Sequence, residues 1–422
     1  MKPFVKKILG ISLGFVSLMS CENQAEILIP AVESSIFTKY VSVGGSLAAG
    51  FTNGGLYREG QLTSYPNLIA LQTGAKFEQP LFSIGQENGS GYFFTKNTMA
   101  VTPTFEQISD KTAIINASPL TFAKYNSTTT NNLGVAGLRM SDIAKNGLGN
   151  AKTTGFNPFY ERILPAGKED LSYAEFVKES NPTFFTASIG DFDMLAFAVS
   201  GGKTTLTETS IFALNTQKLF DALVVNKGKG IVTNVPNVLD LPFLNFYTFQ
   251  EIAKIMGMSD IYITTGNGIV RVATADDKIL LNAIENVGKT NATGQKKGFS
   301  VIFPLSNEEV LDKDEASAVA SRLSDFNGIL KTEAEKRGII LFDLNNLYTQ
   351  IKNKTYTTNN LKFESSVMTG GFFSLDGMNP SPRGSAVIAN EIIKLINENF
   401  KNSLKTVIPT LDVSKFEALK IK

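Results

Sequence analysis

The stretch Lys39-Tyr40-Val41-Ser42-Val43-Gly44-Gly45-Ser46 decides the fold. Residues 39–43 are short and β-prone, the two glycines stop the strand, and the residues that follow can turn into a helix. This order of strand, tight turn and helix comes back later in the chain. We predict further strands at residues 183–189 before Gly190, 301–303 before Pro304 and 339–342 before Asp343.

Two long segments near the C-terminus have helical periodicity. Residues 308–336 place apolar side chains at the spacing of an amphipathic helix. Ser381 can cap a second helix, Pro382 suits its first turn, and apolar residues between 387 and 400 line one side. Buried strands that alternate with such helices predict an α/β fold, with a central parallel sheet covered on both faces.

The first twenty residues have the layout of an export signal. Lys2, Lys6 and Lys7 give a basic start, and residues 8–19 form an apolar run too short to span a bilayer. Leu18-Met19-Ser20-Cys21 then resembles a bacterial lipobox, which implies lipidation of Cys21. An ordinary secretory signal with a chance cysteine is the alternative. We therefore expect a lipid-anchored protein of the bacterial cell envelope, in contact with the outer membrane through Cys21.

Composition excludes several classes of function. The chain has no histidine among 422 residues, so it has no histidine metal ligand and no imidazole base. Cys21 is its one cysteine, which rules out a disulfide framework. Without the signal, 40 − 3 = 37 basic residues face 39 acidic ones, and a net charge of −2 gives no reason to expect nucleic acid. We expect no cofactor and no metal; two loop acids, Asp276 and Asp277, could meet a cation but are usually solvated.

We predict one enlarged domain. The expected order is a signal peptide at 1–20, a tether at 21–37, the domain at 38–402 and a tail at 403–422. Three stretches exceed a minimal fold and are predicted as insertions, because long additions to a compact domain are usually lids, binding loops or elaborated surface. They lie near residues 88–131, 201–230 and 232–297.

The residues that could carry chemistry follow the predicted strands or precede the last helix. Ser46 sits on the tight turn after the first strand, where a serine is exposed at the carboxyl edge of a sheet. Gly137 lies in a segment expected to reach the same edge, where its amide could point into the site. Gly190-Asp191-Phe192-Asp193 follows the next strand, and Asp376-Gly377-Met378-Asn379-Pro380 precedes the helix. Acyl-ester hydrolysis needs such a nucleophile, oxyanion donors, a base and a group that orients the base.

These four blocks resemble the SGNH/GDSL hydrolase superfamily, in particular its large lipoprotein form from Bacteroidetes, over about residues 38–400. The resemblance implies a flavodoxin-like three-layer α/β/α fold with large insertions. It implies Ser46 as nucleophile, Gly137 as oxyanion donor and Asp376 as the orienting acid. Three positions depart from the family pattern: Gly45 replaces an aspartate, Phe192 replaces the oxyanion asparagine, and Asn379 replaces the catalytic histidine.

The departures fall on the chemistry. A neutral amide at Asn379 cannot take a proton from serine. Loss of an oxyanion donor typically costs ~10²- to 10³-fold in rate, and loss of the base on the order of 10⁴-fold. Another base, such as Asp376, Asp191, Asp193 or a desolvated lysine, would need a shifted pKa. Otherwise Ser46 and Asp376 are vestigial, with Asp376 a loop aspartate and Asn379 keeping the loop's hydrogen bonds.

Three functions follow as hypotheses. The first is a catalytically impaired envelope protein that binds a lipid, a glycan or an outer-membrane protein partner through the old cleft and the insertions. The second is an active esterase, lipase or carbohydrate deacetylase that uses Ser46 with a base other than histidine. The third is a structural subunit of a membrane complex, in which the protein's own side chains fill the cleft.

Overall fold

A computed structural model describes residues 35–96, 105–127, 129–284 and 286–421. The predicted signal peptide, Cys21 and all but the last three residues of the predicted tether lie outside these ranges. No helix within the described ranges is long and apolar enough to cross a membrane.

A five-stranded parallel sheet forms the centre of the molecule. Its strand order is β13-β8-β7-β1-β6, and every neighbouring pair is parallel. Numbered along the chain, this is the 2-1-3-4-5 order of the doubly wound, flavodoxin-like sheet. The predicted parallel sheet is thus confirmed. Its strands are β1 (Tyr40–Gly44), β6 (Asn132–Gly134), β7 (Phe184–Ser188), β8 (Lys229–Thr233) and β13 (Ile340–Phe342).

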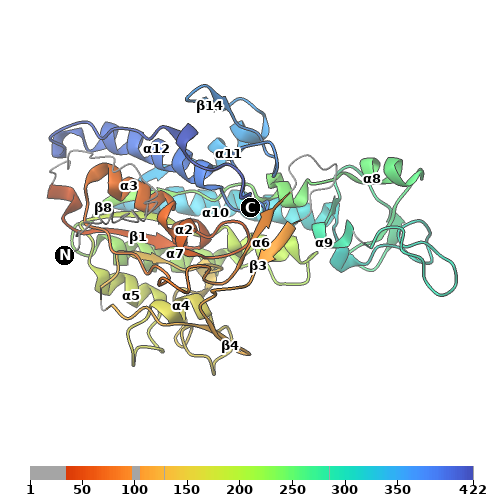
Figure 1. The fold of residues 1–422 in the computed structure, drawn as a ribbon, viewed down its shortest axis with the longest axis horizontal. Helices are drawn as coiled ribbons and strands as arrows, with labels where there is room; N and C mark the ends of the chain where they lie inside the picture. Colours follow the sequence, from red (N-terminus) through yellow and green to blue (C-terminus); the bar gives the residue numbers. More distant parts are fainter. Residues whose placement is uncertain (1–34, 97–104, 128, 285, 422) are drawn as a thin grey trace, which may run out of the picture.

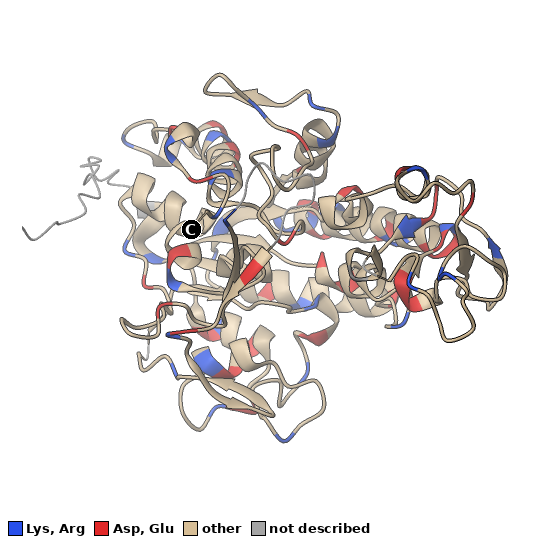
Figure 2. Cartoon of the chain, turned by 45° about the vertical axis from the view of Figure 1, so that its right-hand side comes forward, with Lys and Arg blue, Asp and Glu red and all other residues tan. Residues whose placement is uncertain are grey.

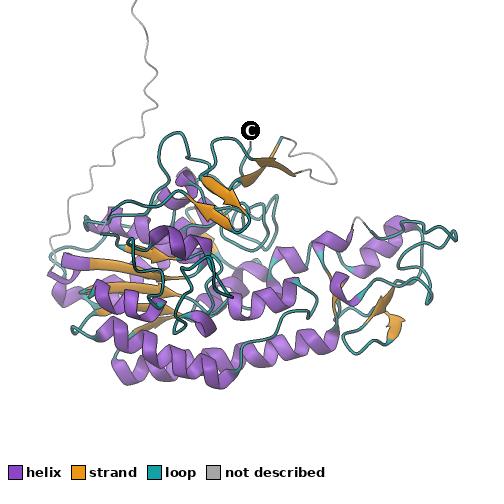
Figure 3. Cartoon of the chain, turned by 90° about the horizontal axis from the view of Figure 1, so that it is seen from below, coloured by secondary structure: helices purple, strands orange, loops and turns teal. Residues whose placement is uncertain are grey.

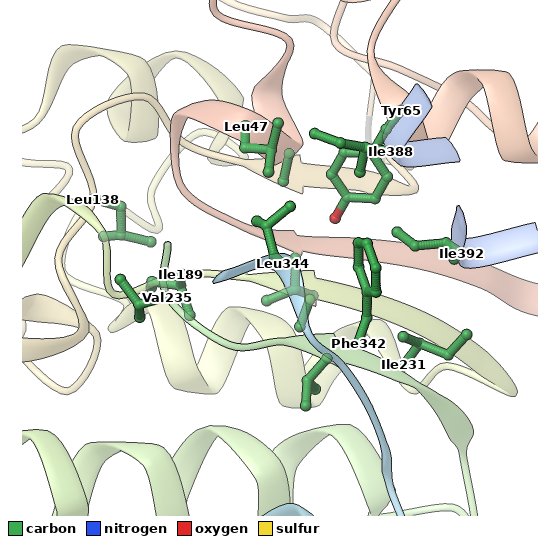
Figure 4. Packing of buried hydrophobic residues seen from close by; sticks show 14 of the residues in the cluster. Leu47, Tyr65, Leu138, Ile189, Ile231, Val235, Phe342, Leu344, Ile388 and Ile392 are labelled. Carbon is green, nitrogen blue, oxygen red and sulfur yellow. The ribbon is translucent and has the colours of Figure 1, made fainter. Parts of the chain in front are cut away.

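Helices cover both faces of this sheet (Figures 1 and 3). On one side α3 packs against α12, and on the other α7 packs against both α5 and α10. Figure 4 shows Ile388 and Ile392 of α12 beside Tyr65 of α3, over Phe342 of the sheet. On the opposite face Phe212 and Phe326 stack with their ring centroids 3.7 Å apart. The helices are α3 (Tyr65–Thr73), α5 (Tyr173–Ser180), α7 (Thr209–Val224), α10 (Lys313–Arg337) and α12 (Pro382–Asn399).

The two predicted C-terminal helices form, and polar caps fix their first residues. Asp312 accepts hydrogen bonds from the backbone N–H groups of Asp314 and Glu315, which starts α10. This start lies later than predicted because Val310–Leu311 forms strand β12. Ser381 caps α12 by accepting from the Gly384 N–H at 3.1 Å, with Pro382 as the first helical residue.

One predicted strand is wrong. Residues 301–303 form a turn outside the central sheet, and Val301 and Ile302 are 59% and 73% exposed. In chain order, the fourth strand of the sheet is instead β8, which pairs with β7 on one side and with β13 on the other. Residues 209–233, most of which we predicted within insertions, therefore supply α7 and β8 to the frame.

Residues 246–310 form a separate unit that we call the arm. It projects from one end of the sheet, opposite the end where the described chain begins (Figures 1 and 3). The arm has its own small core, which includes Phe249, Ile252, Ile263 and Leu305. Its elements are α8 (Phe249–Met256), β9 (Tyr262–Thr264), β10 (Val270–Val272), β11 (Lys278–Ile279) and α9 (Leu281–Ile284), with β12 pairing with β11 at its base.

The buried carboxylate of Asp277 links the arm to α10. Arg271 donates two hydrogen bonds of 2.7 Å to the carboxylate of Asp277, which also accepts from the Lys313 N–H at 2.7 Å. Burial raises the pKa of Asp277, but the Arg271 guanidinium and the donors of Thr274 and Lys313 outweigh it and lower the pKa below its ordinary value. Asp277 is therefore buried and paired, where we predicted a solvated loop acid.

The remaining elements surround the frame. Residues 403–421 run along α12 with Ile408, Leu411 and Val413 buried, so the segment that we predicted as a tail packs on the domain. The predicted 88–131 insertion holds two hairpins. The elements are α1 (Ser46–Ala49), α2 (Arg58–Leu62), β2 (Tyr92–Thr95), β3 (Phe105–Ile108), β4 (Ile114–Ala117), β5 (Leu120–Phe122), α4 (Pro158–Ile163), α6 (Phe192–Val199), α11 (Leu344–Lys352), β14 (Thr357–Thr358) and β15 (Leu361–Lys362).

Candidate functional site

The candidate site lies where β1, β6 and β7 end. Gly44 pairs in register with both Gly134 and Ser188, so the residues that follow these strands emerge at one edge of the sheet. In a sheet of this order, ligands bind at this edge, beside the strands where the order reverses. Gly44 has φ +137°, and a Cβ there would lie 2.0 Å from the Ser188 carbonyl oxygen, so only glycine fits the turn.

Ser46 and Gly137 meet at this edge. The Gly137 N–H donates a hydrogen bond of 3.1 Å to Ser46 Oγ, across 91 residues of sequence. Gly137 has φ +72°, a left-handed conformation that turns its amide toward the serine. Within the described part of the chain, no carboxylate, amide oxygen or other side chain accepts the proton of this hydroxyl. The geometry offers an oxyanion-type donor but no base.

Asp376 is saturated with hydrogen bonds from its own loop and from a distant one. Its Oδ1 accepts from the N–H groups of Met378 and Asn379, both at 2.8 Å. Its Oδ2 accepts from the Gly54 N–H at 2.9 Å and from Asn379 Nδ2 at 3.1 Å. Asn379 thus keeps the side-chain link to the carboxylate, and Asp376 acts as the hub of the loop.

The loop around Asn53 is a part of the site that sequence reasoning missed. The Asn53 N–H donates to Ser374 Oγ at 2.8 Å, and Asn53 Oδ1 accepts from the Leu375 N–H at 3.1 Å. Thr52 Oγ1 donates to the Pro380 carbonyl at 2.9 Å. The signal in the sequence is Asn53-Gly54-Gly55, a turn motif in which Asn53 has φ +51°. This loop clamps the segment that carries Asp376 and Asn379.

Phe192 stands at the first position of α6 and lies against Gly137. A Cβ on Gly137 would be 3.8 Å from the Phe192 ring, and the Arg139 guanidinium lies 5.7 Å from the ring centroid. The ring thus places apolar surface beside the Ser46 turn. No hydrogen-bond donor comes from this side chain.

Gly45 leaves room for Asp191. A Cβ at position 45 would lie 3.6 Å from Asp191 Oδ1, so an aspartate there would bring a second carboxylate against the first. Burial raises the pKa of Asp191, although backbone hydrogen bonds at Asp191 and Phe192 oppose the shift. Among the described residues no cationic side chain pairs with this carboxylate.

Asp193 serves the structure of a neighbouring loop. Its carboxylate accepts from the Met140 N–H at 2.6 Å, the Ser141 N–H at 3.0 Å and Thr207 Oγ1 at 2.7 Å. Burial raises its pKa to about 6, against the opposing effect of these three donors. All of its hydrogen bonds are directed at residues other than Ser46, so Asp193 does not replace the base.

The cavity at this edge is small. It has a volume of about 20 Å³, room for about one water molecule. Polar groups of Ser188, Asp191, Tyr348 and Asn379 line it together with apolar side chains of Leu47, Leu195, Pro236, Val238, Leu241, Leu344, Met378 and Pro380. Burial, followed by the nearby carboxylates of Asp191 and Asp376, raises the pKa of Tyr348. This cavity is therefore too small for a substrate, and neither Ser46 nor Gly137 is among its lining residues.

Searches for known relatives and for metal clusters add no assignment. Across the described ranges, no group of three or more acidic, histidine or cysteine side chains is arranged to hold a metal ion. Acidic and basic residues alternate along the chain in the view of Figure 2. No protein-family model matches the chain. No curated protein matches it either.

Proposed function

We propose that this protein is a catalytically silent relative of the SGNH/GDSL hydrolases, anchored in the bacterial envelope through a lipid on Cys21, and that it acts by binding. The observation that carries the proposal is the state of Ser46. Its hydroxyl oxygen accepts a hydrogen bond from the Gly137 N–H, but its own proton has no acceptor among the described residues. Position 379, where the superfamily places its histidine, holds an amide that is bonded to Asp376.

Two of the three carboxylates considered as alternative bases are engaged elsewhere, and the third, Asp191, forms no hydrogen bond with Ser46 in the described part of the chain. Asp376 already accepts four hydrogen bonds, which favour its charged form but leave it committed to the loop. Asp193 is committed to the 140–141 backbone. General-base catalysis contributes typically 10²- to 10⁴-fold, and the phenyl ring of Phe192 adds no oxyanion donor. Ester hydrolysis should therefore be close to background.

The small volume of this cavity supports a binding surface elsewhere on the molecule. A pocket for a small molecule usually measures about 300–1,000 Å³, far more than the ≈ 20 Å³ found beside Asp191 and Asn379. A lipid, glycan or outer-membrane protein partner would then contact outer surfaces such as the arm. The same observation favours a second candidate function, a structural subunit of a membrane complex, which would show a partner at constant stoichiometry in pull-downs.

Hydrolysis of short p-nitrophenyl esters tests the proposal. The parent chain and Ser46→Ala should give the same rate, close to the rate without protein. A fluorophosphonate probe, which labels activated serines, should label neither. Turnover or labelling that Ser46→Ala abolishes would mean that the chain is an active esterase with an unusual base.

A further inference from the structure

The arm carries a concentration of exposed apolar side chains. Eight of the eighteen large apolar side chains that are exposed in the described residues belong to the arm, although it spans only residues 246–310. Large exposed apolar patches on a soluble surface mark contacts with other proteins or with membranes. The arm is therefore the part of the molecule most suited to an apolar contact.

Five of these side chains belong to two segments of the arm, the end of α8 with the turn after it and the 298–303 loop, and we call them the tip patch: Ile255, Met256, Met258, Val301 and Ile302. Gly288 joins its two halves, because a Cβ there would lie 2.3 Å from Met256 Cε and 3.3 Å from the Phe299 ring. The hydrogen bond from the Gly298 N–H to the Phe303 carbonyl closes the loop that presents Val301 and Ile302. The end of α8 and the 298–303 loop thus approach each other at Gly288.

Three lysines border the tip patch. Lys254 precedes Ile255 on α8, Lys289 follows Gly288, and Lys296 lies in the segment whose backbone pairs with residues 288–289. All three are exposed, and none forms an ion pair within the described residues. Lys297, by contrast, is neutralised by Glu309 at 2.7 Å. The patch therefore combines apolar side chains with three lysines outside the described ion pairs, of which Lys289 donates to Asn286 Oδ1 at 3.0 Å. Glu251 and Asp260 are exposed acidic residues of the segment that carries Lys254.

We propose that the tip patch docks on an anionic lipid surface. Apolar side chains that enter the boundary between headgroups and acyl chains, with lysines that reach lipid phosphates, are the two features of interfacial membrane binding. A second copy of the chain fits this patch less well, because a two-fold contact would set three lysines against three lysines. The inference rests on the proposed binding function and names its partner.

The base of the arm is built to hold the tip in place. Asp277 ties β10 and its following turn to the first residue of α10 through Arg271 and the Lys313 N–H. Asp312, the cap of α10, also accepts from the Gly266 N–H at 2.8 Å. These hydrogen bonds hold the base of the arm against the start of α10, and a preorganised base lowers the entropic cost of docking.

Vesicle flotation tests the proposal. The assay uses a shortened chain that begins at Glu22. This chain keeps every residue of the described fold and lacks the predicted lipid acceptor. Vesicles are phosphatidylcholine alone, or phosphatidylcholine with about one third phosphatidylglycerol. We expect binding to the anionic vesicles, weakening as salt is raised, and little binding to the neutral ones.

Two tip variants and one matched control decide the outcome. Val301→Ser with Ile302→Ser should weaken binding by at least about tenfold, because two apolar side chains no longer enter the lipid. Replacing Lys254, Lys289 and Lys296 by Gln should cost about fivefold per lysine. Val407→Ser removes a side chain that is 77% exposed outside the arm and should change nothing.

The proposal is overturned if the parent chain floats with neither kind of vesicle, or if the tip variants bind as the parent does. It is also overturned if the tip variants still bind lipid as the parent does but lose binding to an acidic protein. Unfolding midpoints equal to that of the parent show that these exposed substitutions leave the fold intact. Vesicle binding does not involve Ser46, so failure here is distinct from failure of the hydrolysis test.

Discussion

Replacement of Asp376 by alanine should destabilise the protein rather than slow a reaction. The change removes the acceptor of three backbone N–H groups, those of Gly54, Met378 and Asn379, in a residue that is 6% exposed. A buried donor left unsatisfied costs about 1–3 kcal/mol. Because Asn379 is half-buried and water can reach part of the loop, we expect a total loss of about 3–5 kcal/mol in the free energy of unfolding.

Urea unfolding of the chain from Glu22, followed by circular dichroism, measures this loss. Asp376→Asn is the matched control, since it keeps one carbonyl oxygen for Met378 and Asn379, and it should cost about 1–3 kcal/mol. Ser46→Ala loses only the Gly137 contact and should cost about 1 kcal/mol. If Asp376→Ala lies within about 1 kcal/mol of the parent, the carboxylate is not the hub of the loop and our structural interpretation is refuted.

Three further changes test the site and the arm. Asn379→His restores an imidazole, and ester hydrolysis should rise by about 10²-fold over the parent and vanish again with Ser46→Ala, whereas no gain would show that more than a base is missing. The folded pKa of Asp193, about 6, exceeds its ordinary 3.8, so this group's contribution makes the free energy of unfolding fall, by up to about 3 kcal/mol, as the pH rises from about 4 to about 6. Urea unfolding at several pH values across this range should show that the free energy of unfolding falls less steeply with pH in Asp193→Asn than in the parent. An equal dependence on pH in the two proteins would contradict the raised pKa of Asp193. Asp277→Asn breaks the buried pair with Arg271, which should cost about 3 kcal/mol and raise hydrogen exchange in residues 246–310 while the sheet keeps its protection; uniform exchange would mean that the arm does not open on its own.

The parts of the fold that could be predicted are those with a local cause. Residues 40–44 form the buried strand β1, one residue later than predicted, because they are β-prone and a second glycine follows, and the last helix starts where Ser381 and Pro382 place it. β8 could not be found in this way. Its sequence, Lys229-Gly230-Ile231-Val232-Thr233, has one charged residue and one glycine in five, and its role as a strand depends on pairing with β7 and β13.

The prediction of a strand at residues 301–303 was wrong for the opposite reason. Val301-Ile302-Phe303 has strong β-propensity, but the segment lies in the arm and reaches no edge of the sheet, so two of its side chains face solvent. High β-propensity means that a side chain packs well on a half-buried sheet, and no neighbouring strand is present among the described residues to form one with residues 301–303.

In the candidate site, chain order brought Ser46 and Gly137 together as expected, because parallel strands end at the same edge. The attachment of Asp376 to Gly54 could not be predicted, since 322 residues separate them. The small volume of the cavity beside Asp191 and Asn379 could not be predicted either. Its walls come from loops after β1, β7, β8 and β13 and from the segment before α12, and their fit is a property of the packed whole.

Helix α10 joins the arm to the sheet, and its length has a mechanical consequence. Its 25 residues make a rod of about 37 Å that starts beside Asp277 and ends at Arg337, with Gly338 and Ile339 between it and β13. A pull or a push on the arm is therefore delivered along a stiff strut to the outer strand of the sheet, and any load that the tip bears is shared by the whole body instead of being absorbed in a hinge.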